Sequence, residues 1–154
     1  RGKPARNPGS TAGERFHLTG GCARRPRADS CAAICRGEAK AFETDKLALA
    51  AAKVAIDRRW DMKIDEPARQ FFYLPLMHSE NLCDQERCVR LMKERMPQSG
   101  ESNLLHARAH REVIRQFGRF PYRNEVLRRK PSGLEQAYVE DGGYGKTVRL
   151  LQAG

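Results

Sequence analysis

The fold is decided by the stretch SENLCDQERCVRLMKERM, residues 79–96. Its apolar residues Leu82, Val89 and Met92 recur at helical spacing, which places them on one face and leaves charged residues on the other. The turn residues that follow, from Pro97 to Gly100, end the pattern. The stretch therefore predicts an amphipathic helix that packs one face against a neighbour.

The segment before this helix, FFYLPLMH at residues 71–78, interrupts its apolar run with Pro75. Proline lacks the backbone N–H and disfavours the helical conformation in the residue before it. We therefore expect one helix to end near Leu74 and the next to begin around Ser79, which can cap it. His78 would then lie at the junction of the two helices.

Further helices are predicted before and after these segments. Before them, Asp65-Glu66-Pro67 is typical of a helix start. Residues 38–60, further upstream, are rich in Ala, the best helix former. The side chains expected on the inner face of this Ala-rich helix are Phe42, Leu47, Ala50, Ala51, Val54 and Ala55. Downstream, residues 102–117 repeat the amphipathic pattern, and Gly118 ends it.

The C-terminal part contains further helix signals. A short helix from Asn124 to Arg129 is expected after the turn GRFPYRN, residues 118–124. Ser132-Gly-Leu-Glu135 is a capping box, and the helix that it starts would close at Gly142-Gly143. No alternating segment of useful length predicts a strand. The sequence thus predicts an all-α fold of helices packed as antiparallel pairs.

Length and composition narrow the class of protein. A chain of 154 residues is long enough for one domain. No apolar run reaches the roughly 18 residues that a membrane span needs. Its five cysteines are irregularly spaced, which favours free thiols in a soluble cytoplasmic protein over a disulfide scaffold. We expect no association with membranes, and the sequence leaves the oligomeric state open.

Residues 1–35 differ from the rest of the chain. They hold seven Lys and Arg against two acids and show no helical or strand periodicity. Such a segment buries too little apolar surface to offset the entropy of ordering it. The predicted organisation is a basic tail, disordered or not native to the protein, over residues 1–35, a helical domain over 36–145 and a C-terminal tail over 146–154.

Three blocks of this sequence, in this order and at these separations, resemble the bacterial domain of unknown function 924 family. The blocks are RGEAKAFETDKLAL (36–49), FFYLPLMHSENLCDQE (71–86) and AHREVIRQFGRFPYRNEVL (109–127). The resemblance covers roughly residues 34–145. It implies an all-helical, right-handed array similar to tetratricopeptide repeats, and it implies no established activity.

The chain departs from the family pattern in places. The family has a helical segment before Arg36-Gly37, where this chain has the unusual basic stretch. We therefore expect an altered or truncated N-terminus. Tyr122 stands where the family usually has His, and Arg128 stands where Gly is usual.

The candidate catalytic groups are His78, Glu80 and His110. A histidine near a helix N-terminus is kept neutral and is fit to accept a proton, which favours a role for His78. Capping of the following helix explains Glu80 equally well. His110 follows His106 by four residues, a spacing that places both on one helix face.

We expect no metal and no cofactor. Apart from His78 or Glu80, no third ligand is evident for a metal on the His106 and His110 face. The cysteines of the tail, Cys22, Cys31 and Cys35, match no common structural zinc spacing.

The candidate ligand-binding residues are Arg119, Arg123 and Asn124, which flank or follow the turn at Pro121. Guanidinium groups beside a helix N-terminus suit a carboxylate or a phosphate. The alternative is that one of these arginines links helices by pairing with an acid. The acids considered for that pairing are Glu80, Asp84 and Asp45.

Three functions follow from these patterns. The first is a binding domain whose polar pocket takes an anionic small molecule or an acidic peptide. The second is a hydrolase-type enzyme with His78 or His110 as the base. The third is RNA binding through a basic face that includes Arg128, Arg129 and Lys130, although no nucleic-acid motif supports it and nucleic acid is not the favoured partner. The sequence does not decide whether the chain is an enzyme.

Overall fold

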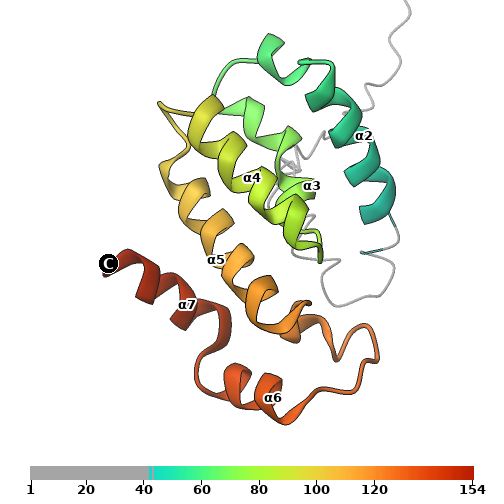
Figure 1. The fold of residues 1–154 in the computed structure, drawn as a ribbon, viewed down its shortest axis with the longest axis vertical. Coiled ribbons are helices and arrows are strands. Elements are labelled where there is room, and N and C mark those ends of the chain that lie inside the picture. The colour runs from blue at the N-terminus through green and yellow to red at the C-terminus, as the bar shows by residue number, and fades with distance from the viewer. Residues whose placement is uncertain (1–41, 43) are drawn as a thin grey trace, which may run out of the picture.

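The computed structural model describes residues 42 and 44–154. Predictions for the basic tail and its cysteines lie outside these residues. The described part is helical and contains no strand, which confirms the all-α class (Figure 1). Its α-helices and 3₁₀-helices (η), in chain order, are α2 (Asp45–Asp57), η2 (Asp61–Lys63), η3 (Ala68–Phe72), α3 (Leu74–Met77), α4 (Leu82–Arg95), α5 (Glu101–Phe117), η4 (Pro121–Arg123), α6 (Gly133–Glu140) and α7 (Gly143–Gln152).

The centre of the structure is the antiparallel pair of α4 and α5 (Figure 1). Helices α2 and α3 pack on the α4 side, and α7 packs on the α5 side. The main core lies between α2, α3, α4 and α5, and its fully buried members include Ile56, Tyr73, Leu76, Met92 and Met96. A second, smaller core lies at the C-terminal end of α5 and consists of Val113, Ile114 and Phe120, with Phe117, Tyr138 and Tyr144 packed against it.

The structure corrects the boundaries expected around Pro75. Leu74 begins the short helix α3, and Pro75 lies in its first turn. A proline is tolerated there because the amide of a first-turn residue has no helical partner in any case. The cap of α4 is Asn81, whose Oδ1 accepts the backbone N–H groups of Cys83 at 2.9 Å and Asp84 at 3.3 Å. Ser79, expected to be the cap, lies two residues upstream of it.

The predicted inner face of the Ala-rich helix is wrong in part. Leu47 is 74% exposed and Val54 is 46% exposed, so both lie on the outer side of α2. The residues buried against the core are Ala52, Ala55 and Ile56. Because this helix is apolar on two opposite faces, periodicity alone could not select the inner one.

The C-terminal half confirms the strongest local signals. Gly118 adopts the left-handed conformation, with φ of 69°, and ends α5. Both hydrogen bonds of the capping box between Ser132 and Glu135 are present at the start of α6. The short helix expected from Asn124 to Arg129 is absent. In its place, η4 is followed by turns, with Arg128 at φ of 51°.

Helix α7 covers most of residues 146–154, the stretch that the sequence analysis assigned to a C-terminal tail. It packs against α5 and carries Tyr144 to the second core. Among the described helices, none is long and apolar enough to cross a membrane.

Candidate functional site

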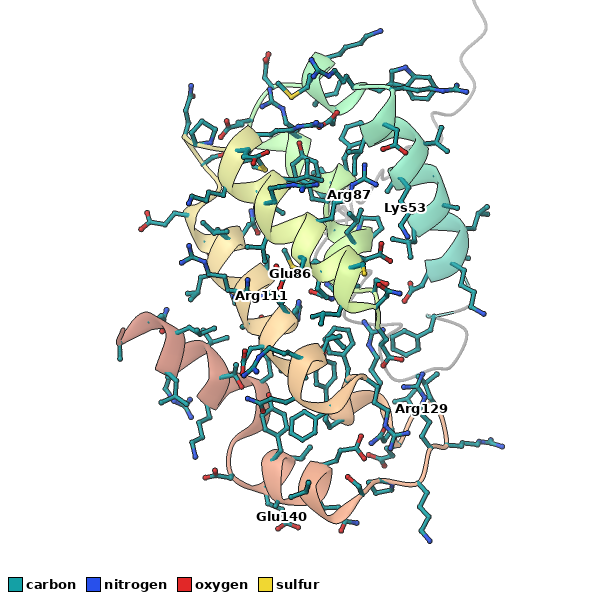
Figure 2. All side chains as sticks on the ribbon, in the orientation of Figure 1. Lys53, Glu86, Arg87, Arg111, Arg129 and Glu140 are labelled. Atoms are coloured by element: carbon teal, nitrogen blue, oxygen red, sulfur yellow. The ribbon has the colours of Figure 1, made fainter. Side chains whose placement is uncertain are left out.

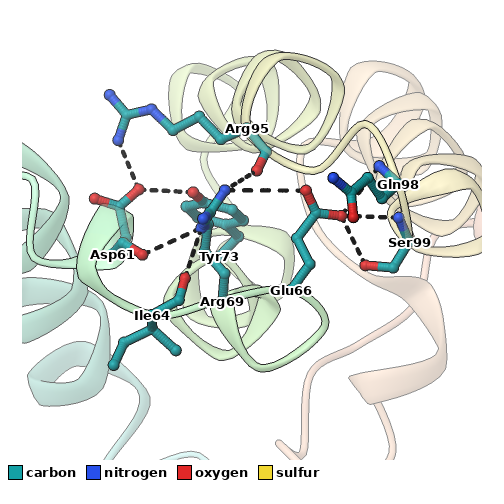
Figure 3. Close-up of polar contacts among 8 residues, drawn as sticks. All are labelled: Asp61, Ile64, Glu66, Arg69, Tyr73, Arg95, Gln98 and Ser99. Atoms are coloured by element: carbon teal, nitrogen blue, oxygen red, sulfur yellow. Dashed lines mark hydrogen bonds and ion pairs between the residues drawn. The ribbon is translucent and has the colours of Figure 1, made fainter.

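Polar side chains form a network at the end of the α4–α5 pair where the two helices are joined (Figure 3). The fully buried carboxylate of Asp61 is its centre. The Oδ2 atom of Asp61 accepts hydrogen bonds from the Tyr73 hydroxyl and from Arg95 Nη1, both at 2.6 Å. Burial raises the pKa of Asp61, but these two donors outweigh it and the net pKa is lowered. Asp61 is therefore an ionised carboxylate held by two partners.

Two further side chains extend this network to the surrounding loops. Arg69 donates to the backbone carbonyls of Asp61 at 3.2 Å and Ile64 at 2.9 Å, and also to that of Arg95. Glu66 accepts the backbone N–H groups of Gln98 and Ser99 and the Ser99 hydroxyl (Figure 3). We call Asp61, Glu66, Arg69, Tyr73 and Arg95 the Asp61 network. Its contacts fix loops to one another, which is a structural role.

Histidines and aromatic rings gather at the opposite end of the pair. His110, on α5, is buried, and its ring centroid lies 4.7 Å from that of Tyr144, 5.3 Å from that of Phe120 and 5.6 Å from that of His78. The Nδ1 atom of His110 is buried without a hydrogen-bond partner in the described part of the chain. We call His78, His106, His110, Phe120 and Tyr144 the His110 cluster.

The electrostatic surroundings keep His110 neutral. Burial lowers its pKa to about 3, and interactions with His78, Arg123 and His106 act in the same direction. A neutral imidazole can accept one hydrogen bond and donate another, according to its tautomer. His110 is therefore suited to hold a polar group of a ligand, and it is too weak a base to take up a proton at neutral pH.

His106 and Tyr144 hold α7 against α5 at this cluster. The Tyr144 hydroxyl lies 2.7 Å from His106 Nδ1, and the two rings are stacked with centroids 6.0 Å apart. Burial raises the pKa of Tyr144 well above its usual range, so its hydroxyl stays protonated. Nothing in the sequence pointed to Tyr144, because it lies 38 residues from its partner.

The two arginines predicted to bind a ligand have different surroundings. Arg119 donates two hydrogen bonds, of 2.6 and 2.8 Å, to the buried carboxylate of Glu135. The guanidinium of Arg123 lies over the rings of Phe42 and Phe120, 4.7 and 4.6 Å from their centroids. Among the described residues it forms an ion pair with Asp45, at 3.9 Å. Arg119 is thus bound to α6 through a bidentate pair with Glu135, whereas the ion pair of Arg123 is longer.

The partner of Glu80 is an arginine that the sequence analysis did not pair with it. Arg129 donates two hydrogen bonds to Glu80, of 2.9 and 2.8 Å, and the Phe120 backbone N–H donates a third at 3.0 Å. Burial raises the pKa of Glu80, but these donors outweigh it and the net pKa is lowered. Glu80 therefore anchors the loop after α5 to the start of α4, and its charge is neutralised within the chain.

Asn124, the third predicted ligand-binding residue, is 4% exposed. Neither Nδ2 nor Oδ1 of its side chain has a hydrogen-bond partner in the described part of the chain. The amide nevertheless lies close enough to Glu135 to contribute to the lowered pKa of that carboxyl, after Arg119 and the Ser132 backbone. Asn124 thus resembles His110 in being buried with unused hydrogen-bonding capacity.

The structure brings His78, His110 and Arg123 into one neighbourhood and gives Glu80 and Arg119 structural partners. Within residues 42 and 44–154, no three His, Cys, Asp or Glu side chains are grouped as a metal would require. The free thiols described are Cys83, which is exposed, and Cys88, which is buried away from the cluster in the main core.

Comparisons with known proteins give the family context. A family model described as a bacterial protein of unknown function (DUF924) matches residues 31–143. None of the curated proteins matches the chain. Among solved structures, that of a protein of unknown function from Agrobacterium tumefaciens is similar, with 38% sequence identity and a TM-score of 0.65. The similarity covers 73% of this chain and 62% of that one, so this chain spans less than two thirds of its relative.

Proposed function

The chain belongs to the DUF924 family of bacterial proteins, and from this premise we propose that it binds a small anionic molecule, or the acidic end of a peptide, at the His110 cluster. The observation that carries the proposal is the buried Nδ1 of His110, which lacks a hydrogen-bond partner among the described residues. Leaving such an atom unpaired costs about 1–3 kcal/mol. A polar group from outside the chain would remove this cost.

The local charge favours an anion. The guanidinium of Arg123 lowers the pKa of His110, so a fixed positive charge acts on its ring. Glu80 contributes little opposing charge, because Arg129 holds both of its carboxylate oxygens. A carboxylate or phosphate group near Arg123 would gain a charge-assisted hydrogen bond, and an adjoining hydroxyl could pair with His110.

Hydrolysis with His110 as the base is less well supported. A pKa of about 3 leaves the imidazole a poor proton acceptor at neutral pH, since an effective general base has a pKa near the working pH. Binding through hydrogen bonds needs no such proton transfer. The buried amide of Asn124 supports the same conclusion, because its Oδ1 is an acceptor that no described residue uses.

The test is a thermal-shift panel of phosphorylated metabolites, dicarboxylates and an acidic peptide on the purified chain. A ligand at 100 times its dissociation constant should add about 2.7 kcal/mol to the free energy of unfolding. We expect one anion class to raise the melting temperature of the wild type. Arg123→Gln should remove that response, because it deletes the guanidinium that lies over Phe120 of the His110 cluster and pairs with Asp45 at 3.9 Å.

A matched control is Arg111→Gln. Arg111 lies on α5, and its partner is Glu86 on α4, at 3.4 Å (Figure 2). This variant should respond to the anion as the wild type does. The proposal fails if no anion class shifts the melt, or if Arg123→Gln and Arg111→Gln respond equally.

A further inference from the structure

Helix α2 is apolar on two opposite faces. One face packs into the main core through Ala52 and Ile56. The opposite face is exposed and consists of Leu47, Ala50, Ala51 and Val54, which we call the outer stripe. Leu47 is 74% exposed and Val54 is 46% exposed. An exposed apolar surface rimmed by charged residues often marks an interaction site, so the outer stripe has the composition of a contact surface.

The outer stripe has a symmetric pattern. Its members follow one another at intervals of three, one and three residues, with the larger side chains at both ends and alanines in the middle. If two copies of α2 pack antiparallel about a two-fold axis between Ala50 and Ala51, Leu47 lies against Val54 of the partner subunit. An isologous contact requires such self-complementarity. The central alanines allow the two helices to approach closely, because interaxial distance depends on the side chains at the contact.

Charges beside the outer stripe fit the same arrangement. Lys46 and Asp57 lie on the same flank of α2, near its opposite ends. In an antiparallel pair related by a two-fold axis, like flanks meet. Lys46 would therefore face Asp57 of the partner subunit, and the contact would occur twice. Asp57 already pairs with Arg87 at 2.5 Å, yet its side chain is 64% exposed, which leaves room for a second cation.

We propose that the outer stripe is the contact surface of a homodimer in which two α2 helices pack antiparallel. A helix of this length extends about 20 Å, so one helix pair gives an interface at the small end of the known range. Trp60, Met62 and Ile64 continue the exposed apolar residues along the chain after α2. The association is expected to be reversible and dependent on concentration.

The first experiment is sedimentation velocity of the purified chain over a concentration series. We expect the wild type to move from monomer to dimer as concentration rises, and the double variant Leu47→Glu with Val54→Glu to stay monomeric. The control is Leu134→Glu on α6, because Leu134 is 78% exposed and so matches Leu47 in exposure. It should dimerise as the wild type does. Circular dichroism melts of dilute samples should show that the wild type and both variants are folded.

The second experiment tests the geometry. Ala51→Cys places a thiol beside the proposed two-fold axis, whereas Ala48→Cys places one on α2 away from the outer stripe. Mild oxidation should link the first variant into a covalent dimer more than the wild type or the second variant. A wild type that stays monomeric throughout the series, a dimer that survives the double variant, or equal cross-linking of both cysteine variants would each overturn the proposal.

Discussion

The two ends of the α4–α5 pair both contain buried polar groups, but they use them differently. In the Asp61 network, the buried carboxylate holds a tyrosine hydroxyl and a guanidinium, and its neighbours Glu66 and Arg69 bind backbone groups of η2, of the residue after it, of the end of α4 and of the turn between α4 and α5. In the His110 cluster, the buried imidazole Nδ1 has no described partner. The polar groups at the first end hydrogen-bond mainly to other groups of the fold, whereas at the second end the Nδ1 atom of His110 has no described partner.

Whether a buried polar group has a hydrogen-bond partner separates structural from functional groups better than residue type does. An arginine, an acid and a tyrosine lie at both ends, so the presence of these residue types does not distinguish them. One oxygen of Asp61, Oδ1, is also unpartnered, but Oδ2 of the same group accepts two strong hydrogen bonds. The unpartnered Nδ1 of His110 is the stronger indication of a ligand, because among the described residues no hydrogen bond offsets the burial of this atom.

The largest expected effect on stability is in the Asp61 network. Asp61→Ala removes the acceptor of Tyr73 and Arg95 and leaves both donors poorly satisfied. We expect the free energy of unfolding to fall by about 3 kcal/mol, as when one partner of a buried pair is removed. Urea unfolding at neutral pH measures it. Glu86→Ala, at a carboxylate that is 56% exposed, is the control and should cost less than about 1 kcal/mol. Equal losses in both variants would show that the network is not structural.

The second prediction concerns the pH dependence of stability that His110 causes. The pKa of His110 is lowered to about 3 in the folded chain, so only the unfolded chain binds this proton as pH falls through about 6.5. Stability from His110 is therefore present above that pH and is lost as pH decreases, with a slope approaching about 1.4 kcal/mol per pH unit. The lowered pKa values of Asp61 and Glu80 act further down, below the usual range of carboxyl groups.

Urea unfolding at stepped pH, from neutral down to about pH 5, separates these contributions. His110→Leu should reduce the slope in this window, whereas Glu86→Gln should leave it unchanged. An undiminished slope in His110→Leu would mean that His110 takes up its proton in the folded chain as readily as in the unfolded one.

Local signals predicted much of this fold. The spacing of apolar residues gave α4 and α5, Gly118 gave the end of α5, and Ser132 with Glu135 gave the start of α6. These elements depend on residues within a few positions of one another. The side of α2 that faces the core could not be predicted, because both of its faces are apolar.

The candidate site was predictable only by residue type. His78, His110 and Arg123 were selected from local patterns, and the structure places them around one another. Their long-range partners were not predictable, since Glu80 and Arg129 are 49 residues apart and Asp61 and Arg95 are 34 apart. Such pairs depend on how the helices pack, which the spacing of residues in one helix does not encode.

The third prediction contrasts the two ends directly. His110→Leu keeps the volume of the side chain roughly constant and removes an atom that has no described partner. We expect the free energy of unfolding without ligand, at a pH above 7, to fall by no more than about 1 kcal/mol, because the burial cost of the unpaired atom is removed as well. The same urea assay that reports on Asp61→Ala measures it. A loss as large as that of Asp61→Ala would mean that the imidazole is part of the fold, and the binding proposal would lose its main support.

The smallest expected effect on stability concerns two arginines with positive φ, one near each end of the α4–α5 pair. Arg59, near the Asp61 network, and Arg128, in the loop after α5, adopt positive φ of 55° and 51°. This conformation costs a residue with a side chain about 1–2 kcal/mol, and glycine avoids the cost but loses more entropy on folding. Arg59→Gly and Arg128→Gly should therefore each raise the free energy of unfolding by about 0.5 kcal/mol.

Strained residues often lie at functional sites, so the two glycine variants test whether Arg128 has a role in binding that Arg59 lacks. If the conformation is only a feature of the turns, both glycine variants should gain stability equally in urea, and neither should change the response to anions. If the Arg128 side chain serves the ligand, Arg128→Gly should gain stability and yet respond less to the anion that shifts the wild type. Arg59→Gly would keep its full response. A loss of stability in either variant would show that the arginine side chain makes a contact that outweighs the backbone strain.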